Sequence, residues 1–285
     1  MRLFASAVFA CLLSGTVPGS GTVPGLGTVP GAPQSARVLG LLSGTVPDPP
    51  QSPRVSVLVE LFTSEGCSSC PAADDLLRRL TQEQPLAGVE IIGLSEHVDY
   101  WNQLGWRDPF SSSRFTSRQE LYSVHFDGNG MYTPQAIVDG RFQMIGSDAP
   151  KLRDAILASA KEPKASVTVQ ARVVAPERAA VAVDVRDVPA GQRGDFDVMV
   201  AVIENGLAID VKRGENASRR LHHDAVVRFL GRAGTLRRDV TSGTFRSEVK
   251  LPAGWSRPNL KVVVFLQHRG NSRIVGAAVT GIAAS

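Results

Sequence analysis

Cysteine is scarce in this sequence: its 285 residues include three, Cys11, Cys67 and Cys70. So few cysteines exclude the dense disulfide framework of a small cross-linked secreted domain. A second C-x-x-C is also missing, so the sequence does not offer the four sulfur ligands of a closed zinc site. Cys67 and Cys70 close too small a loop to restrain a chain of this length, and their closeness therefore calls for a chemical explanation.

The sequence also lacks a strong excess of one charge. It has 31 Lys and Arg against 27 Asp and Glu, a net charge of +4, and its basic residues are scattered. We therefore expect no nucleic-acid partner. With 43% hydrophobic and 20% charged residues the composition is that of a soluble globular protein, and the length suffices for two ordinary domains.

An apolar run long enough to span a bilayer is missing from the N-terminal region. The run from Leu3 to Leu13 is too short, but it follows Arg2 and precedes small residues, as in a secretory signal peptide. We predict a signal peptide over residues 1–20 and no stable membrane insertion after its removal. Cys11 would leave with it, and the mature protein would be periplasmic or secreted, in an oxidising compartment.

Residues 21–53 are rich in Gly and Pro and repeat short motifs such as "GTVPG". Such density of Gly and Pro is incompatible with a packed core. The pattern predicts a low-complexity linker.

Residues 54–161 alternate strand and helix signals. "VSVLVELF" predicts a buried strand, "PAADDLLRRL" a helix with one apolar face, and "VEIIGLSEHV" a second strand, which together form a βαβ unit. A helical insert follows, then a hairpin turning at Asp139-Gly140 and a last helix in "SDAPKLRDAILASA". Residues 165–285 instead alternate apolar and polar residues between turn signals, which predicts a separate all-β, sandwich-like domain.

The C-x-x-C lies between the first strand and the first helix. A helix N-terminus stabilises a thiolate at Cys67, and Cys70 is placed to close a disulfide on it. A C-x-x-C beside a βαβ unit suggests a redox pair in which Cys67 attacks and Cys70 resolves the mixed disulfide. His97 ends the second strand, and the carboxyl ends of parallel strands share one edge, so we expect His97 near Cys67.

Several motifs carry a resemblance to a known family: "VELFTSEGCSSCPAADDLL", "HVDYWNQLGWRDPF", "RQELY", "YTPQAIVDG" and "GENASRRLHHDAVVR". They resemble a bacterial secreted family, thioredoxin-like and catalogued only as a domain of unknown function, within the thioredoxin superfamily. The resemblance implies an α/β thioredoxin-like domain (βαβ…ββα with a helical insert) over residues 54–161, followed by the all-β sandwich-like domain over residues 165–285.

The resemblance also implies site residues. Thr133-Pro134 matches the cis-proline that faces the C-x-x-C and holds an extended substrate, and Glu60 resembles the buried acid beneath the disulfide. The C-x-x-C, its context and the compartment together predict thiol-disulfide exchange with protein or small-molecule thiols and disulfides, without a cofactor. The predicted catalytic residues are Cys67, Cys70, Glu60 and His97, and the predicted substrate-binding residues are Thr133, Pro134 and Trp101.

Two other functions compete with redox exchange. Cys67, Cys70 and His97 offer ligands for copper or zinc, although no metal site is complete from sequence. A secreted binding protein could instead use the disulfide to lock its loop.

Other polar residues have simpler interpretations. Glu65 is expected to be a solvated loop charge. His222 and His223 alternate faces on a predicted strand, so at most one points inward, and a contact between the two predicted domains is favoured over catalysis. Asn216, in "NAS", is a glycosylation site only in a eukaryote, which the family resemblance argues against.

Overall fold

The computed structural model describes residues 54–126, 130–191 and 194–284. The signal peptide predicted for residues 1–20 and the linker predicted for residues 21–53 lie outside these residues. No helix in the described ranges is long and apolar enough to cross a membrane.

The first elements follow one another as the sequence predicts: strand, helix, strand, helix, two strands and a helix. They are β1 (Val55–Thr63), α1 (Cys70–Glu83), β2 (Val89–His97), the short helix η1 (Asn102–Leu104), α2 (Ser113–His125), β3 (Gln135–Val138), β4 (Phe142–Ile145) and α3 (Ala149–Ala160). Strands dominate the remainder, which comprises β5 (Ser166–Ala175), β6 (Arg178–Arg186), β7 (Phe196–Glu204), β8 (Leu207–Asp210), β9 (Arg220–His223), β10 (Val226–Leu236), β11 (Gly243–Lys250), η2 (Arg257–Asn259), β12 (Leu260–His268) and β13 (Ile274–Gly281).

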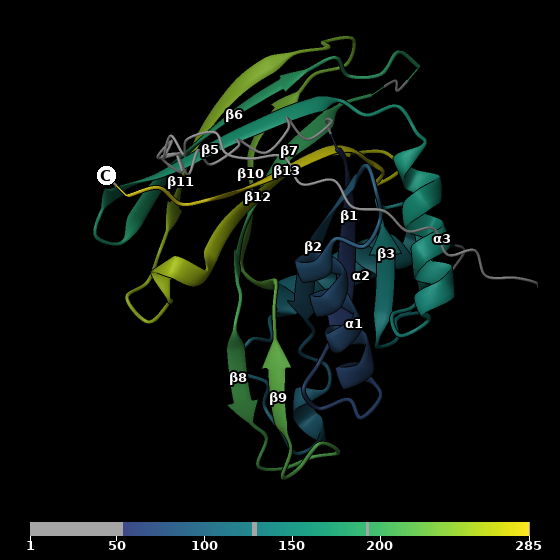
Figure 1. Cartoon of the computed structure of the whole chain (residues 1–285), viewed down its shortest axis with the longest axis vertical. Helices are drawn as coiled ribbons and strands as arrows, with labels where there is room; N and C mark the ends of the chain where they lie inside the picture. The colour runs from purple at the N-terminus through teal and green to yellow at the C-terminus, as the bar shows by residue number, and fades with distance from the viewer. Residues whose placement is uncertain (1–53, 127–129, 192–193, 285) are drawn as a thin grey trace, which may run out of the picture. The chain divides into compact units, whose positions relative to one another are not determined.

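Eight strands form one mixed sheet in the order β13-β12-β7-β10-β2-β1-β3-β4 (Figure 1). β1 is parallel to β2 and antiparallel to β3. β10 joins the other side of β2 at one parallel pair, Val226 opposite Ser95, and the Ser95 N–H donates to the Ala225 carbonyl at 2.8 Å. The sheet begun by β1–β4 therefore continues through β10 into the C-terminal strands.

This continuity shows that the predicted fold class is wrong. Within the described residues the structure is mostly β, with 44% strand and 20% helix, and not an α/β thioredoxin-like domain followed by a separate all-β sandwich. The physical reason is the edge of β2: an unpaired strand edge presents N–H and C=O groups to any strand that can reach it, and β10 occupies that edge. The division into domains at residues 54–161 and 165–285 stays a prediction.

Both faces of the large sheet are covered. On one face α1 and α3 pack over β1–β4, and the three-stranded sheet β11-β6-β5 packs over the C-terminal strands. On the other face Phe115 of α2 joins a cluster that contains Leu58 and Leu94 from the first strands and Ile203 and Phe265 from the later ones. The same hydrophobic cluster thus includes residues from both predicted domains.

Local predictions agree with the structure. Ala73, Leu76 and Leu77 form the buried face of α1. Asp139 and Gly140 have φ of 46° and 63° between β3 and β4, as a tight hairpin turn requires. These features depend on neighbours in sequence, which the pattern of residues captures.

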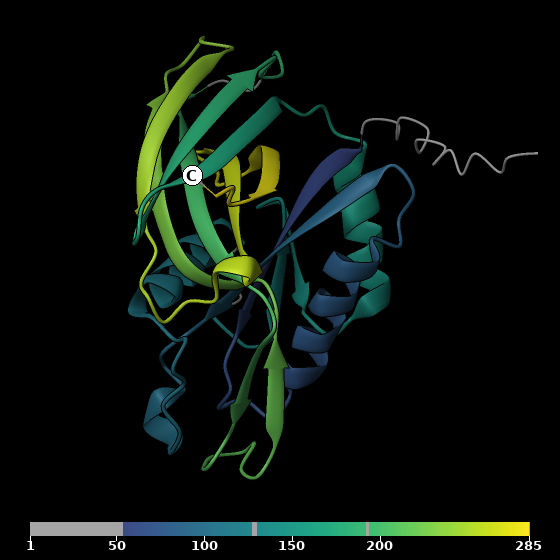
Figure 2. The same cartoon turned by 60° about the vertical axis from the view of Figure 1, so that its left-hand side comes forward.

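The β8–β9 hairpin pairs only within itself in the described chain. It runs away from the large sheet beside α1, which β9 contacts (Figure 1 and Figure 2). Because β10 follows β9 after two residues, the position of β10 on β2 sets where this hairpin lies. The hairpin and its loop reach the segment between β1 and α1.

We expect Phe265→Ala to lower the free energy of unfolding by about 3–5 kcal/mol, because Phe265 is fully buried in the cluster shared by both parts of the chain. We also expect one unfolding transition, coincident by calorimetry and by tryptophan fluorescence, since the sheet is shared. Val240→Ala, at an exposed position, is the control and should change stability by less than about 0.5 kcal/mol. Two resolved transitions in the wild type would mean that the predicted domains unfold independently.

Candidate functional site

Cys67 and Cys70 form a disulfide, with their Cα atoms 5.4 Å apart. Cys70 is the first residue of α1, and its N–H donates to the Cys67 carbonyl at 3.2 Å. Pro71 occupies the first helical turn, where its missing N–H leaves no internal hydrogen bond unmade. The predicted disulfide at the start of a helix is confirmed.

The disulfide is covered by protein. Cys67 is 1% exposed and Cys70 is 0% exposed, whereas Ser68 and Ser69 between them face solvent. A Cβ on Gly66 would lie 3.2 Å from the Trp101 Cβ, so Trp101 packs directly against this loop. The loop has to move before a large reagent reaches Cys67.

The loop that joins β8 to β9 holds the disulfide loop through backbone groups. The Asn216 side chain is fully buried and donates to the carbonyls of Glu65 and Cys67, both at 2.9 Å. The Glu215 carboxylate accepts from the Ser68 N–H at 2.8 Å. The residue that the sequence offered as a glycosylation motif is therefore an internal support.

His97 and Asp108 form a buried ion pair beneath this loop. His97 Nδ1 lies 2.7 Å from Asp108 Oδ2, and both side chains are 0% exposed. The same carboxylate accepts from the N–H groups of Glu65 at 2.9 Å and Phe110 at 2.8 Å. Burial alone would lower the pKa of His97, but the Asp108 charge and hydrogen bond outweigh it and raise that pKa. Burial opposes the Asp108 charge as well, but His97 and the N–H groups hold the pKa of Asp108 below its usual range.

Glu65 is buried, and its expected place as a solvated loop charge is wrong. Its Oε2 accepts from Trp106 Nε1 at 2.7 Å, and its Oε1 lies 3.2 Å from His223 Nε2. The other His223 nitrogen, Nδ1, lies 3.9 Å from Asp74 Oδ2. His223 is buried and His222 exposed, so the predicted alternation of the two histidines is confirmed.

Burial raises the pKa of Asp74 above its ordinary value, although His223 and then His97 act to lower it. Asp74 Oδ1, both His223 nitrogens and His97 Nε2 make no hydrogen bond with any described residue. The imidazole rings of His97 and His223 have centroids 5.0 Å apart. Buried polar atoms without such partners call for an explanation, and here four of them lie close together on three titratable side chains.

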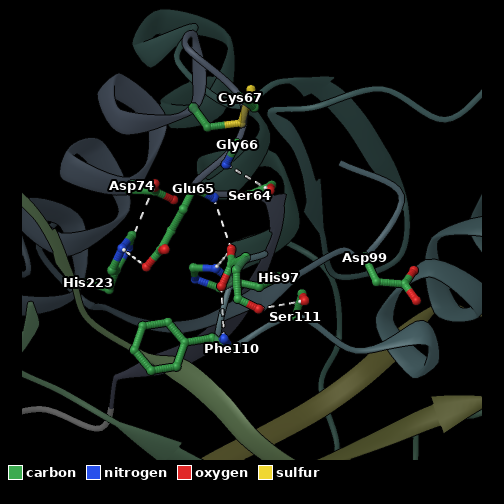
Figure 3. Close-up of polar contacts among 12 residues, drawn as sticks. Ser64, Glu65, Gly66, Cys67, Asp74, His97, Asp99, Phe110, Ser111 and His223 are labelled. Carbon is green, nitrogen blue, oxygen red and sulfur yellow. Dashed lines mark hydrogen bonds and ion pairs between the residues drawn. A yellow bond between two sulfur atoms is a disulfide. The ribbon is translucent and has the colours of Figure 1, made fainter. Parts of the chain in front are cut away.

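These side chains form one group, which we call the acid–base cluster: Glu65, Asp74, His97, Asp108 and His223 (Figure 3). Its members come from α1, β2, β9 and two connecting segments. Asp99 points away from the cluster in Figure 3 and binds Thr116 of α2 instead. The cluster can exchange protons, because it holds carboxylates and imidazoles in mutual contact.

The cluster does not have the arrangement of a metal site. Among the described residues, no three His, Cys, Asp or Glu side chains are placed to hold a metal ion. The disulfide also uses both sulfur atoms that the sequence offered as ligands.

Glu60, predicted to lie under the disulfide, is elsewhere. Its carboxylate binds Arg118 and Tyr122 of α2, on the face of the sheet opposite α1. Glu96 lies 3.4 Å from the same Arg118, and burial raises its pKa well above the usual range. The structure therefore brings His97 to the region of the cysteines but not Glu60.

The Thr133–Pro134 peptide bond is cis, as the resemblance requires, and leads into β3. Pro134 and Ala73 of α1 both pack against Gly146. A Cβ added at Gly146 would lie 3.3 Å from the Pro134 Cβ and 3.1 Å from the Ala73 Cβ. Thr133 Oγ1 is buried without a hydrogen bond to any part of the described chain. The predicted substrate-binding pair thus lies beside the N-terminal half of α1.

The sequence interpretation missed Asp74, Asp108 and Asn216. Asp74 had a weak signal, because it lies one turn after Cys70 on a face that is otherwise apolar. Asp108 and Asn216 lie within motifs that carry the family resemblance, but nothing in those motifs shows which groups they bind. They act on a loop that is distant in sequence.

We expect His97→Gln to destabilise the protein by about 3–5 kcal/mol, because it leaves Asp108 charged and buried. Because the pKa of His97 is higher in the folded protein than its unfolded value of 6.5, protonation of His97 stabilises the fold below pH 6.5. This stabilisation is lost as the pH rises through the pKa of His97 in the folded protein. Because the pKa of Asp108 is lower in the folded protein than its unfolded value of 3.8, the Asp108 carboxylate stabilises the fold above pH 3.8. This stabilisation is lost as the pH falls through the pKa of Asp108 in the folded protein. The deficit of the variant, measured by denaturant unfolding, should therefore be largest near about pH 5 and smaller at about pH 9.

The exposed neighbour His222→Gln is the matched control for this measurement and should leave stability within about 0.5 kcal/mol. An equal deficit of His97→Gln at both pH values would rule out the ion pair.

Comparison with known proteins identifies the family. Residues 58–267 match the family described as "Protein of unknown function (DUF1223)". The crystal structure of protein AGR_C_4864 from Agrobacterium tumefaciens is similar at 31% identity and a TM-score of 0.61, over 81% of this chain and 96% of that one. HBP35 of Porphyromonas gingivalis shares the fold alone, at 13% identity and a TM-score of 0.53, over 81% of this chain and 76% of that one. No curated protein matches the sequence. Since the family match spans well over half of the chain, the chain belongs to the DUF1223 family of proteins of unknown function.

Proposed function

We propose that this protein is a thiol-disulfide oxidoreductase that acts through Cys67 and Cys70 in the periplasm or outside the cell. One observation carries the proposal: the disulfide at the start of α1 is flanked in the chain by Glu65 and Asp74, which belong to a cluster of five buried titratable side chains. Burying such groups opposes folding unless they are fully paired, and they concentrate where chemistry requires them. An oxidising compartment agrees with a formed disulfide.

The exchange follows from the position of the two sulfur atoms. A substrate thiolate attacks Cys67 Sγ, a bond to the substrate sulfur forms, and the Cys67–Cys70 bond breaks with Cys70 leaving as a thiolate. A second substrate thiolate then attacks the substrate sulfur of the mixed disulfide and Cys67 leaves. The substrate pair loses two electrons and two protons, which the cysteine pair gains. The reverse sequence reduces a substrate disulfide.

Two groups support a thiolate at Cys67. The Ser69 hydroxyl lies 3.4 Å from Cys67 Sγ, close enough to donate a hydrogen bond to the sulfur. The Ser69 side chain does not cap α1, so the first-turn N–H groups and the helix dipole remain available to a negative charge. Both lower the pKa of a neighbouring thiol.

Protein or small-molecule thiols and disulfides are the proposed substrates. Thr133 and Pro134 lie near the start of α1, where the backbone of Thr133 can hold an extended substrate; the Pro134 carbonyl already accepts from the Gly146 N–H at 2.9 Å. Trp101 packs against the loop and offers an apolar contact beside it.

The test is a redox titration of the native protein in dithiol buffers of known potential, with free thiols counted by mass after alkylation. We expect one reversible two-electron transition above about −300 mV, the range of exchangeable disulfides. A pair that is not reduced in that range while the protein stays folded would contradict the proposal.

One competing function has an observation in its favour. The low exposure of Cys67 suits a structural disulfide that fixes the loop of a binding protein. That function requires a disulfide that resists reduction, so the same titration separates the two.

The Asn216 contacts predict how access to the disulfide is limited. Asn216→Ala removes two buried hydrogen bonds to the loop, which together contribute about 1–3 kcal/mol. We expect dithiothreitol to reduce the disulfide of the variant about tenfold faster or more, because the loop opens more often. Arg220→Ala, which breaks an exposed ion pair with Asp210 on the same hairpin, is the control and should react like the wild type. Unchanged reduction of Asn216→Ala would mean that the hairpin does not restrict access.

A further inference from the structure

The proposed exchange requires a group that gives a proton to Cys70. When the disulfide opens, Cys70 becomes a thiolate at a position that is 0% exposed, where burial strongly disfavours charge. Two other predicted catalytic residues, Glu60 and His97, are held by other groups. Glu60 is bound to α2 on the opposite face of the sheet, and His97 is paired with Asp108 through Nδ1, which leaves only its Nε2 without a hydrogen bond. A carboxyl on the same helix face as Cys70 is the other source of the proton.

We propose that Asp74 carries the proton of Cys70, and that His223 and Glu65 are positioning residues that set the charge of Asp74. The proposal rests on the proposed thiol-disulfide exchange. Asp74 follows Cys70 by one turn of α1, so the two side chains share a face of the helix. Side chains four residues apart on one helix face are neighbours, so Asp74 and Cys70 lie within one turn of each other, while Asp74 Oδ2 faces His223.

The surroundings of Asp74 suit a group that gains and loses a proton. The side chain is 6% exposed, and Oδ1 makes no hydrogen bond within the described ranges. Its other oxygen faces His223, whose second nitrogen faces Glu65. One imidazole thus lies between two carboxyl groups and can compensate a negative charge on either.

The balance of these neighbours keeps the carboxyl protonated over a wider pH range than usual. Burial raises the pKa of Asp74, His223 and His97 act to lower it, as does the Thr63 hydroxyl, and Asp108 acts to raise it. The net shift is upward. Glu65 is the remaining titratable group in this set and lies against His223.

The proton transfer balances as follows. The neutral Asp74 carboxyl gives its proton to the departing Cys70 thiolate, which yields the Cys70 thiol and an Asp74 carboxylate beside His223. The proton released by the second substrate thiol then returns to Asp74 or to the Cys67 thiolate through solvent. In the reverse direction the Asp74 carboxylate takes the Cys70 proton as Cys70 attacks the mixed disulfide.

The experiment measures the rate of disulfide reduction by dithiothreitol against pH, divided by the dithiothreitol thiolate concentration. In the wild type this corrected rate should fall as pH rises through the pKa of Asp74, because the proton donor is lost. Asp74→Asn should be slower by about tenfold or more at low pH and should show no such fall. His223→Gln should move the fall to higher pH, because it removes the imidazole that lowers the pKa of Asp74.

Each series is repeated with Asn216→Ala, so that loop opening does not hide the exchange step. His222→Gln, the exposed neighbour on β9, should match the wild type throughout. A purely structural role for Asp74 would change the unfolding free energy of the oxidised protein but leave the fall in place.

Three outcomes overturn the proposal while exchange itself stands. The first is a fall in the corrected rate that persists in Asp74→Asn, and the second is a fall that His223→Gln does not move. The third is a corrected rate that does not change with pH in either the wild type or Asn216→Ala. If the native disulfide is not reduced at all, the proposed function fails, and this proposal fails with it.

Discussion

The pairing of β10 with β2 is the interaction on which the candidate site depends. It consists of one parallel register position, Val226 opposite Ser95, with a hydrogen bond from Ser95 to Ala225. His223 precedes Ala225 by two residues, so this contact also sets where β9 lies along α1. A shift of one residue would turn His223 outward and His222 inward, because strand side chains alternate. The register of β10 on β2 therefore decides which histidine of β9 belongs to the acid–base cluster.

The cluster opposes folding unless its charges are compensated. Desolvation disfavours each buried charge, and replacing such groups with well-packed apolar residues is often neutral or stabilising in other proteins. His97 and Asp108 compensate each other at 2.7 Å, and Asp108 gains two N–H donors. Asp74 and His223 are less well satisfied. The proposed proton transfer rests on that difference in pairing between His97–Asp108 and Asp74–His223.

The local structure could be predicted from the sequence, and the assembly could not. The apolar face of α1, the turn at Asp139-Gly140 and the disulfide follow from residues close together in the chain. The continuous sheet depends on which strand fills the edge of β2, and several C-terminal strands have the same apolar pattern. The predicted position of Glu60 under the disulfide is wrong for a related reason. Alternation along β1 directs Glu60 toward α2, and its buried partner Arg118 lies in a helix whose docking the local pattern does not specify.

The hairpin holds the disulfide loop by its backbone, and this has a consequence for the two residues between the cysteines. Asn216 binds the carbonyls of Glu65 and Cys67, whereas Glu215 binds both the N–H and the hydroxyl of Ser68. Ser69 is exposed, and its hydroxyl lies 3.4 Å from Cys67 Sγ. The Ser69 side chain can therefore change the local environment of the sulfur atoms while the loop keeps its support. Access to the disulfide and the chemical environment of its sulfur atoms therefore depend on different parts of the chain. The β8–β9 hairpin limits access, whereas the loop and the acid–base cluster beneath it set the environment of the sulfur atoms.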